Sequence, residues 1–158
     1  MQTVYLETTI PSYLAARRSS QPSLVLRQEA TQRWWAAERH KFYLYCSVFV
    51  VDEVSAGDSN AAARRMGFLR GIPLLPVPTT VQPLAARVAA LLKLPPHAVI
   101  DAAHLAIAIV HRIDFLLTWN CTHLANPVLQ RELIEFCNYH GLHVPVICTP
   151  ELLTDYLP

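Results

Sequence analysis

The stretch FLLTWNCTHLAN (residues 115–126) joins a short apolar run to a polar segment. Its apolar residues 115–117 lead directly into the polar groups of Thr118 and Asn120. A short apolar run that stops at polar side chains is typical of a buried parallel strand that ends at a polar site. The sequence therefore predicts a strand at about 114–117, with functional groups directly after it.

A second segment, TVYLETT (residues 3–9), has the same pattern. Its apolar and β-prone residues predict a strand at 3–6, which is followed by Glu7 and Thr8. The carboxyl ends of parallel strands meet at one edge of a sheet, and open α/β sheets bind ligands there. We therefore expect Glu7 and Asn120 to lie at the same edge of the sheet.

Further strands and helices alternate along the chain. We expect strands near 42–45, 73–76 and 144–147, and a short helix whose first turn contains Pro11. Ser47 is expected to cap another short helix that closes at Gly57. Longer helical patterns cover about 23–40, 59–70, 80–93, 97–112 and 127–140. This alternation predicts a single α/β domain (1–158) with a parallel sheet covered on both faces.

The composition of the 158 residues narrows the classes of protein. An apolar fraction of 53% against 16% charged residues favours a compact core, and no apolar run reaches membrane length. No secretory signal is evident, and the four cysteines form no CxxC pair, so we expect reduced thiols and a cytoplasmic location. With four glycines there is no GxGxxG motif and no P-loop, so side chains at the strand ends must form any site.

The charge is unevenly distributed although its net value is only +1. Residues 1–80 contain nine Lys and Arg against six Asp and Glu, and the remainder contains four against six. A loose basic series runs through the N-terminal half. It fits either an ordinary solvated face or a patch that follows phosphates.

Two more carboxylates lie in apolar helical patterns. Glu53 is within SVFVVDEVSAG, and Asp101 is within the most apolar helical segment of the chain. Each has a structural alternative, because Asp101 near a helix start interacts well with the dipole and Glu53 could pair with Arg64 or Arg65. Together with the strand ends, however, they form a set of hard oxygen ligands that suits Mg²⁺ or Mn²⁺.

These segments resemble the PIN domain (PilT N-terminus) nucleases, in particular VapC-like toxins of toxin–antitoxin pairs. The resemblance covers nearly the whole chain through VYLETTIPSYL, SVFVVDEVSAG, DAAHLAIAIVHRIDFLLTWN and HLAN. It implies a three-layer α/β/α sandwich, Mg²⁺- or Mn²⁺-dependent cleavage of RNA, a homodimer and a small antitoxin partner. Glu53 and Asp101 match the acids of the family pattern, whereas Glu7 replaces its first Asp and Asn120 its fourth.

The expected catalytic set is therefore Glu7, Glu53, Asp101 and Asn120, with the first three as metal ligands. The carbonyl oxygen of Asn120 would act as a ligand or water anchor. Thr8 and Thr118 would position water or phosphate, or else cap their strand ends.

Two further interpretations remain open. His104, three residues after Asp101, would orient that carboxylate, or pack in the core or against a partner. The substitutions at the first and fourth acidic positions also leave two alternatives to an RNA-cleaving enzyme. One is a catalytically weakened PIN-like domain that binds RNA or a protein partner, and the other is a nuclease that acts on DNA.

Overall fold

The computed structural model describes residues 1–154, and five strands of this part form one sheet. Every neighbouring pair of strands is parallel, as predicted. The order is β3-β2-β1-β4-β5, with β1 (Thr3–Leu6), β2 (Tyr43–Ser47), β3 (Leu74–Leu75), β4 (Phe115–Leu117) and β5 (Val146–Cys148).

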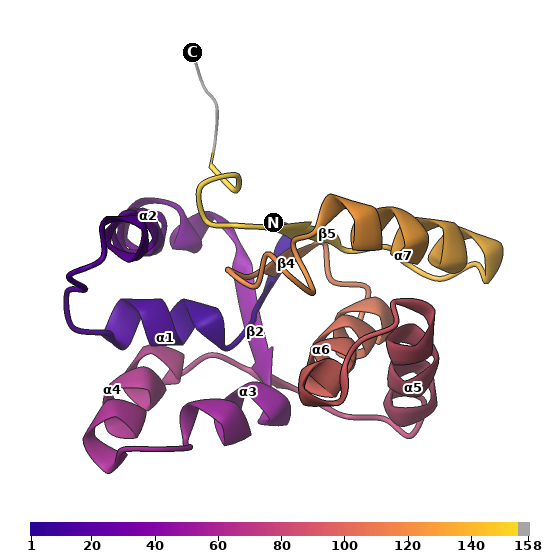
Figure 1. The fold of residues 1–158 in the computed structure, drawn as a ribbon, viewed down its shortest axis with the longest axis horizontal. Coiled ribbons are helices and arrows are strands. Elements are labelled where there is room, and N and C mark those ends of the chain that lie inside the picture. Colours follow the sequence, from indigo (N-terminus) through magenta and orange to yellow (C-terminus); the bar gives the residue numbers. More distant parts are fainter. Residues whose placement is uncertain (155–158) are drawn as a thin grey trace.

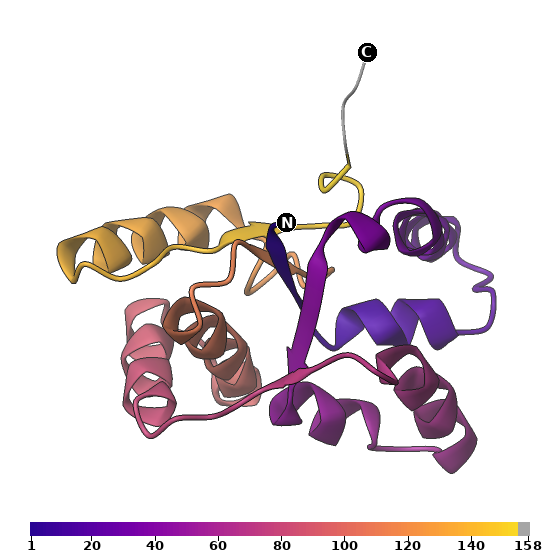
Figure 2. The same cartoon turned by 180° about the vertical axis from the view of Figure 1, so that it is seen from behind.

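Helices cover both faces of this sheet (Figure 1). On one side lie α1 (Thr9–Ala15), α2 (Pro22–Ala37) and α4 (Ser59–Leu69), and on the other α5 (Val81–Leu91), α6 (Val99–Val110) and α7 (Pro127–Tyr139). The short helix α3 (Val48–Val54) follows β2 directly, and the 3-10 helices η1 (Arg39–Lys41) and η2 (Pro96–Ala98) precede β2 and α6. Figure 2 shows the same arrangement from behind. The expected α/β/α sandwich is confirmed.

The core consists of two apolar clusters, one on each side of the sheet. The larger joins α5 and α6 to the sheet, and the smaller joins α1 and α2 to it. Helix α6 is buried almost all round, and its buried polar residues are Asp101 and His104. Burying two polar side chains in so apolar a helix costs free energy unless both have hydrogen-bond partners.

The site expected at the sheet edge falls where the strand order reverses. The chain builds β2 and β3 on one side of β1 and then returns to place β4 and β5 on the other. The register pairs Leu6 with Leu117, so the residues that follow these two strands emerge side by side. This is the topological switch point at which open α/β sheets bind ligands.

The structure differs from the sequence expectation in the loop after β2. Helix α3 begins after Ser47, but the Ser47 hydroxyl makes no capping hydrogen bond and instead lies 2.7 Å from the Tyr5 hydroxyl. The helix ends at Val54 rather than at Gly57, which adopts a left-handed φ of 83° in the following loop. Within residues 1–154, no helix combines the length and apolar character that a membrane span requires.

Candidate active site

Glu7 directly follows β1 and is almost completely buried, with 4% of its surface exposed. Its Oε2 accepts hydrogen bonds from the Thr9 hydroxyl (2.6 Å), the Thr118 hydroxyl (2.7 Å) and the Thr9 backbone N–H (3.1 Å). Thr9 Oγ1 in turn accepts from the backbone N–H of Trp119 at 2.8 Å. The ends of β1 and β4 are therefore tied together through this carboxylate.

Glu53 reaches the same edge from α3, and its side chain is one-third exposed. The Thr8 hydroxyl donates to Glu53 Oε1 at 2.6 Å, and His104 Nε2 lies 2.6 Å from the same oxygen. Burial acts to raise the pKa of Glu53, but the hydrogen bonds from His104 and Thr8 outweigh it and hold the pKa below its ordinary value. These two hydrogen bonds therefore favour the charged form of Glu53.

Asp101 lies in the first turn of α6 and is 7% exposed. Its Oδ2 accepts a hydrogen bond from Asn120 Nδ2 at 3.0 Å and lies 3.2 Å from His123 Nδ1. Burial raises the pKa of Asp101 above its ordinary value, while the Asn120 hydrogen bond opposes this rise and the nearby Glu53 charge adds to it. Asp101 and Glu53 thus interact electrostatically although they come from different helices.

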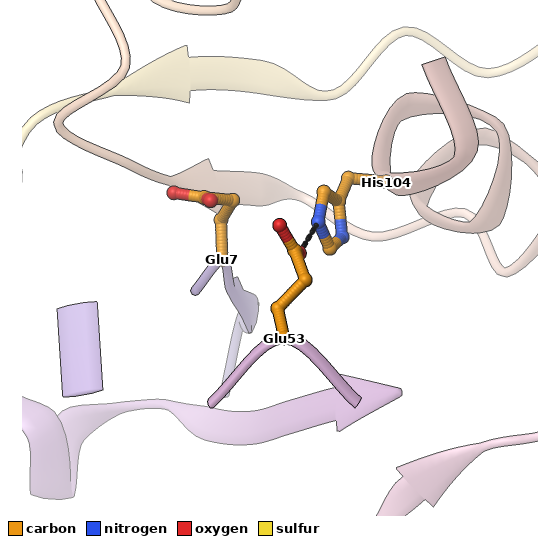
Figure 3. A group of neighbouring side chains, drawn as sticks. All are labelled: Glu7, Glu53 and His104. Atoms are coloured by element: carbon orange, nitrogen blue, oxygen red, sulfur yellow. Dashed lines mark hydrogen bonds and ion pairs between the residues drawn. The ribbon is translucent and has the colours of Figure 1, made fainter. Parts of the chain in front are cut away.

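His104 connects Glu53 to two hydroxyl groups in the core. The ring is completely buried, and its Nδ1 lies 2.7 Å from the hydroxyl of Tyr5. That hydroxyl lies 2.7 Å from Ser47 Oγ. Figure 3 shows Glu53 extending toward the His104 ring, with Glu7 beside it at the strand end.

Each of the three carboxylates uses only one of its two oxygens for hydrogen bonds and ion pairs. All hydrogen bonds and ion pairs of Glu7 fall on Oε2, those of Glu53 on Oε1, and those of Asp101 on Oδ2. Within the described part of the chain, the other oxygen of each has no protein partner. Among the described residues, the one fully buried side-chain N or O atom without a hydrogen-bond partner is Trp34 Nε1. The free oxygens of the three carboxylates are therefore not fully buried and keep contact with solvent.

This donor set fits a divalent cation. Glu7, Glu53 and His104 each place one ligand atom within 4.8 Å of the other two, and Asp101 lies outside this tight group. Among residues 1–154, no Lys or Arg pairs with any of the three acids. Free carboxylate oxygens with no Lys or Arg partner suit Mg²⁺ or Mn²⁺.

Thr8 and Thr118 both hold carboxylates. Thr8 donates to Glu53 and Thr118 donates to Glu7, so each hydroxyl orients an acid of the site. Arg65 does not pair with Glu53, because its guanidinium donates to the carbonyls of Val54 and Ala56.

The Asn120 amide makes two hydrogen bonds at the site. Its nitrogen donates to Asp101, and its carbonyl oxygen accepts from the backbone N–H of His123 at 3.0 Å. The oxygen that was expected to act as a ligand or water anchor thus accepts one backbone hydrogen bond, and the amide nitrogen fixes the carboxylate of Asp101 beside it.

The sequence did not predict three of the contacts that the acids make. His104 was expected to orient Asp101 or to pack in the core, but it contacts Glu53, which lies on a different helix. His123 reaches Asp101 from the turn after β4, and Thr9 holds Glu7 from the first residue of α1. Their contacts depend on how α3, α6 and the two strand ends are placed, which periodicity does not specify.

Comparison with known proteins supports the fold. No family model matches the chain, and no curated protein matches it significantly in sequence. Among solved structures, VapC20 from Mycobacterium tuberculosis, described as a Sarcin-Ricin loop cleaving toxin, is 14% identical with a TM-score of 0.59 over 76% of this chain and 92% of its own.

A second structure with the same arrangement is VapBC2 from Rickettsia felis, solved with a DNA fragment from the promoter. It is 11% identical with a TM-score of 0.59, over 94% of this chain and 98% of the matched one. At such low identity the likeness concerns the path of the backbone. The chain has the PIN-like fold of these VapC structures.

Proposed function

We propose that the protein is a metal-dependent endoribonuclease of the PIN type and the toxin of a toxin–antitoxin pair. The observation that carries this proposal is the free oxygen on each of three carboxylates, Glu7, Glu53 and Asp101, at the switch point of the sheet. No Lys or Arg within the described residues neutralises them. Such a site attracts a divalent cation, and through it the phosphate of a substrate.

The roles of the side chains follow from their contacts. Glu7, Glu53 and Asp101 would hold Mg²⁺ or Mn²⁺, which supplies a bound water of lowered pKa and compensates charge on the phosphate. The hydroxyls of Thr8 and Thr118 keep two of these carboxylates in place. The reaction would need no covalent intermediate, because a water activated in this way can attack the phosphodiester directly.

The substrate and partners are proposed from the resemblance. VapC20 is described as cleaving the Sarcin-Ricin loop, which favours a structured RNA as the substrate here. The likeness to VapBC2 and the resemblance to VapC-like toxins favour a small antitoxin protein as partner. The resemblance alone favours a homodimer as the active assembly.

A fixed cation near the site supports binding of nucleic acid. The Arg27 guanidinium lies 5.3 Å from the centre of the Trp119 ring, and Trp119 is tied to the Glu7 cluster through Thr9. Arg27 belongs to the basic series of the N-terminal half, so one member of that series lies beside Trp119, in the segment that follows β4. A phosphate neighbouring the scissile one is a suitable partner for it.

Cleavage by the purified chain tests the proposal. The protein is incubated with Mg²⁺, with Mn²⁺ or with EDTA, on a panel that includes a Sarcin-Ricin loop fragment, unstructured RNA and single-stranded DNA. We expect RNA cleavage that EDTA abolishes and that Asp101→Asn and Glu7→Gln remove. Thr3→Val, at the opposite end of β1, serves as the control and should cleave normally.

The same panel distinguishes the two alternatives. Cleavage of DNA in preference to RNA would identify a DNA-acting nuclease. Tight RNA binding without metal-dependent turnover would identify a weakened PIN-like domain. Growth arrest on expression, relieved by Asp101→Asn or by coexpression of a neighbouring small gene, would support the toxin assignment.

A further inference from the structure

Three completely buried side chains lead from the core of the protein to Glu53. Ser47 Oγ lies 2.7 Å from the Tyr5 hydroxyl, Tyr5 lies 2.7 Å from His104 Nδ1, and His104 Nε2 lies 2.6 Å from Glu53 Oε1. We propose that Ser47, Tyr5 and His104 form a positioning chain, which holds Glu53 Oε1 and leaves Oε2 free to bind a metal ion. The proposal rests on the proposed function and deepens it.

The direction of the hydrogen bonds supports this assignment. An ionised carboxylate only accepts hydrogen bonds, so His104 Nε2 carries the hydrogen that points to Glu53. In the neutral ring, Nδ1 then accepts from the Tyr5 hydroxyl, and Tyr5 accepts from Ser47. Every donor in the chain then points toward Glu53, and every atom in it has a partner.

Simple core packing does not explain these residues. Tyr5, Ser47 and His104 are all fully buried, and apolar side chains would fill the same space without a desolvation cost. The Ser47 hydroxyl even forgoes the capping bond that its position before α3 offers. Of the four linked residues, only Glu53 reaches solvent, so the hydrogen bonds converge on the residue that can meet a ligand.

Glu53 is held from two sides. Thr8 and His104 both donate to Oε1, so the carboxylate has a fixed rotation and one oxygen left over. Hydrogen bonds to a metal ligand of this kind raise its affinity by orienting it in advance, and their removal typically weakens metal binding about 10–100-fold. We expect the loss of the His104 donor to have an effect in this range.

Direct measurement of Mn²⁺ affinity on the full chain tests the proposal, by electron paramagnetic resonance of free and bound Mn²⁺. His104→Leu should weaken Mn²⁺ binding about 10-fold or more. His104→Gln, whose amide can donate from a similar position, should recover most of this loss. Tyr5→Phe, which removes one oxygen and leaves the ring, should weaken binding by about threefold to tenfold.

The control is Thr3→Val on the same strand as Tyr5. This variant removes the two hydrogen bonds that the Thr3 hydroxyl makes with Asp114 at the far end of β1. It should therefore lower the melting temperature without changing Mn²⁺ affinity. Unchanged affinity in folded Tyr5→Phe and His104→Leu, with only a lower melting temperature, would overturn the positioning assignment.

Two further results are diagnostic. A nitrogen bonded directly to Mn²⁺, detected by pulsed resonance and lost in His104→Leu, would make His104 a ligand and overturn the assignment. Failure of the proposed function is separate, because the unmodified protein would then neither bind Mn²⁺ nor cleave RNA. Normal cleavage and Mn²⁺ binding in all Tyr5 and His104 variants would leave the enzyme assignment intact and remove only the positioning chain.

Discussion

Asn120 stands where the PIN-domain sequence pattern has its fourth acid. Its contacts explain why an amide suits this position. Its nitrogen donates to Asp101 Oδ2 at 3.0 Å while its oxygen accepts from the His123 backbone. A carboxylate could keep the second bond but not the first, and it would place like charges in contact. The amide therefore stabilises the ionised form of Asp101 instead of adding a fourth charge.

Asn120→Asp tests this explanation. Without metal, we expect a loss of about 1–3 kcal/mol in the free energy of unfolding, because one hydrogen bond is replaced by repulsion between carboxylates. With Mn²⁺ the added charge should tighten binding and raise occupancy of a second ion. Chemical denaturation in EDTA and Mn²⁺ titration measure the two effects. A variant as stable as the parent in EDTA would contradict the explanation that the Asn120 amide stabilises Asp101.

Asp101 and Glu53 should give opposite pH dependences in the metal-free protein. Because the pKa of Asp101 is raised above 3.8, stability falls as the pH rises through the interval up to the folded-state pKa. Asp101→Asn removes this loss, so we expect it to be stabilising by about 1 kcal/mol at neutral pH and neutral well below pH 3.8. Denaturation in EDTA across this range is the measurement.

Glu53 should give the opposite pH dependence of stability. Its pKa is lowered from 4.5, so its contribution to stability is complete above that value and is lost as the pH falls through the lowered pKa. Glu53→Gln should therefore cost stability at neutral pH, and the cost should shrink in acid. Parallel curves for the parent and for Glu53→Gln would show that the hydrogen bonds from Thr8 and His104 do not favour the ionised form.

At the scale of elements, the site depends on how two strand ends are joined. The Thr9 hydroxyl, at the start of α1, donates to Glu7 and accepts from the backbone of Trp119 after β4. It therefore connects the acid of one strand to the backbone of the next. This contact belongs to the junction of β1, α1 and β4, and no single element would form it alone.

Thr9→Val tests the junction. The variant keeps the shape of the side chain but removes one donor and one acceptor, so we expect a loss of about 1–3 kcal/mol in the free energy of unfolding. Glu7 would lose one of its three hydrogen bonds, and Mn²⁺ affinity should fall as well. Thr9→Ser retains the hydroxyl and should behave like the parent, and equal stability of the Val and Ser variants would contradict this role.

The same junction marks how far the sequence alone could predict the structure. Runs such as those ending at Glu7 and Asn120 predict strands and polar ends, because local periodicity determines whether a segment is buried. Which strands are neighbours depends on long-range packing, and so do the partners of His104 and the direction of the Asn120 amide. The acids could be identified from their apolar surroundings, whereas the groups that orient them come from elements far apart in the chain.

The three acids of the site come from three separate elements of the fold. Glu7 follows the central strand β1, Glu53 lies on α3 next to β2, and Asp101 lies on α6 on one face of the sheet. Without a counter-ion, their mutual repulsion opposes the packing of these elements. A cation bound among them would link the sheet to helices from both halves of the chain.

Metal binding should therefore stabilise the entire fold and not only a loop. At a Mn²⁺ concentration about 100 times the dissociation constant, ligand linkage gives about 2.7 kcal/mol of stability. For a domain of this size, that raises the melting temperature by about 5–10 °C. Calorimetry with Mn²⁺ and with NaCl of equal ionic strength separates specific binding from screening. Asp101→Asn should lose most of the Mn²⁺ shift while keeping a high melting temperature in EDTA. An equal rise with NaCl, or an undiminished Mn²⁺ shift in this variant, would show that the three carboxylates do not form a common metal site.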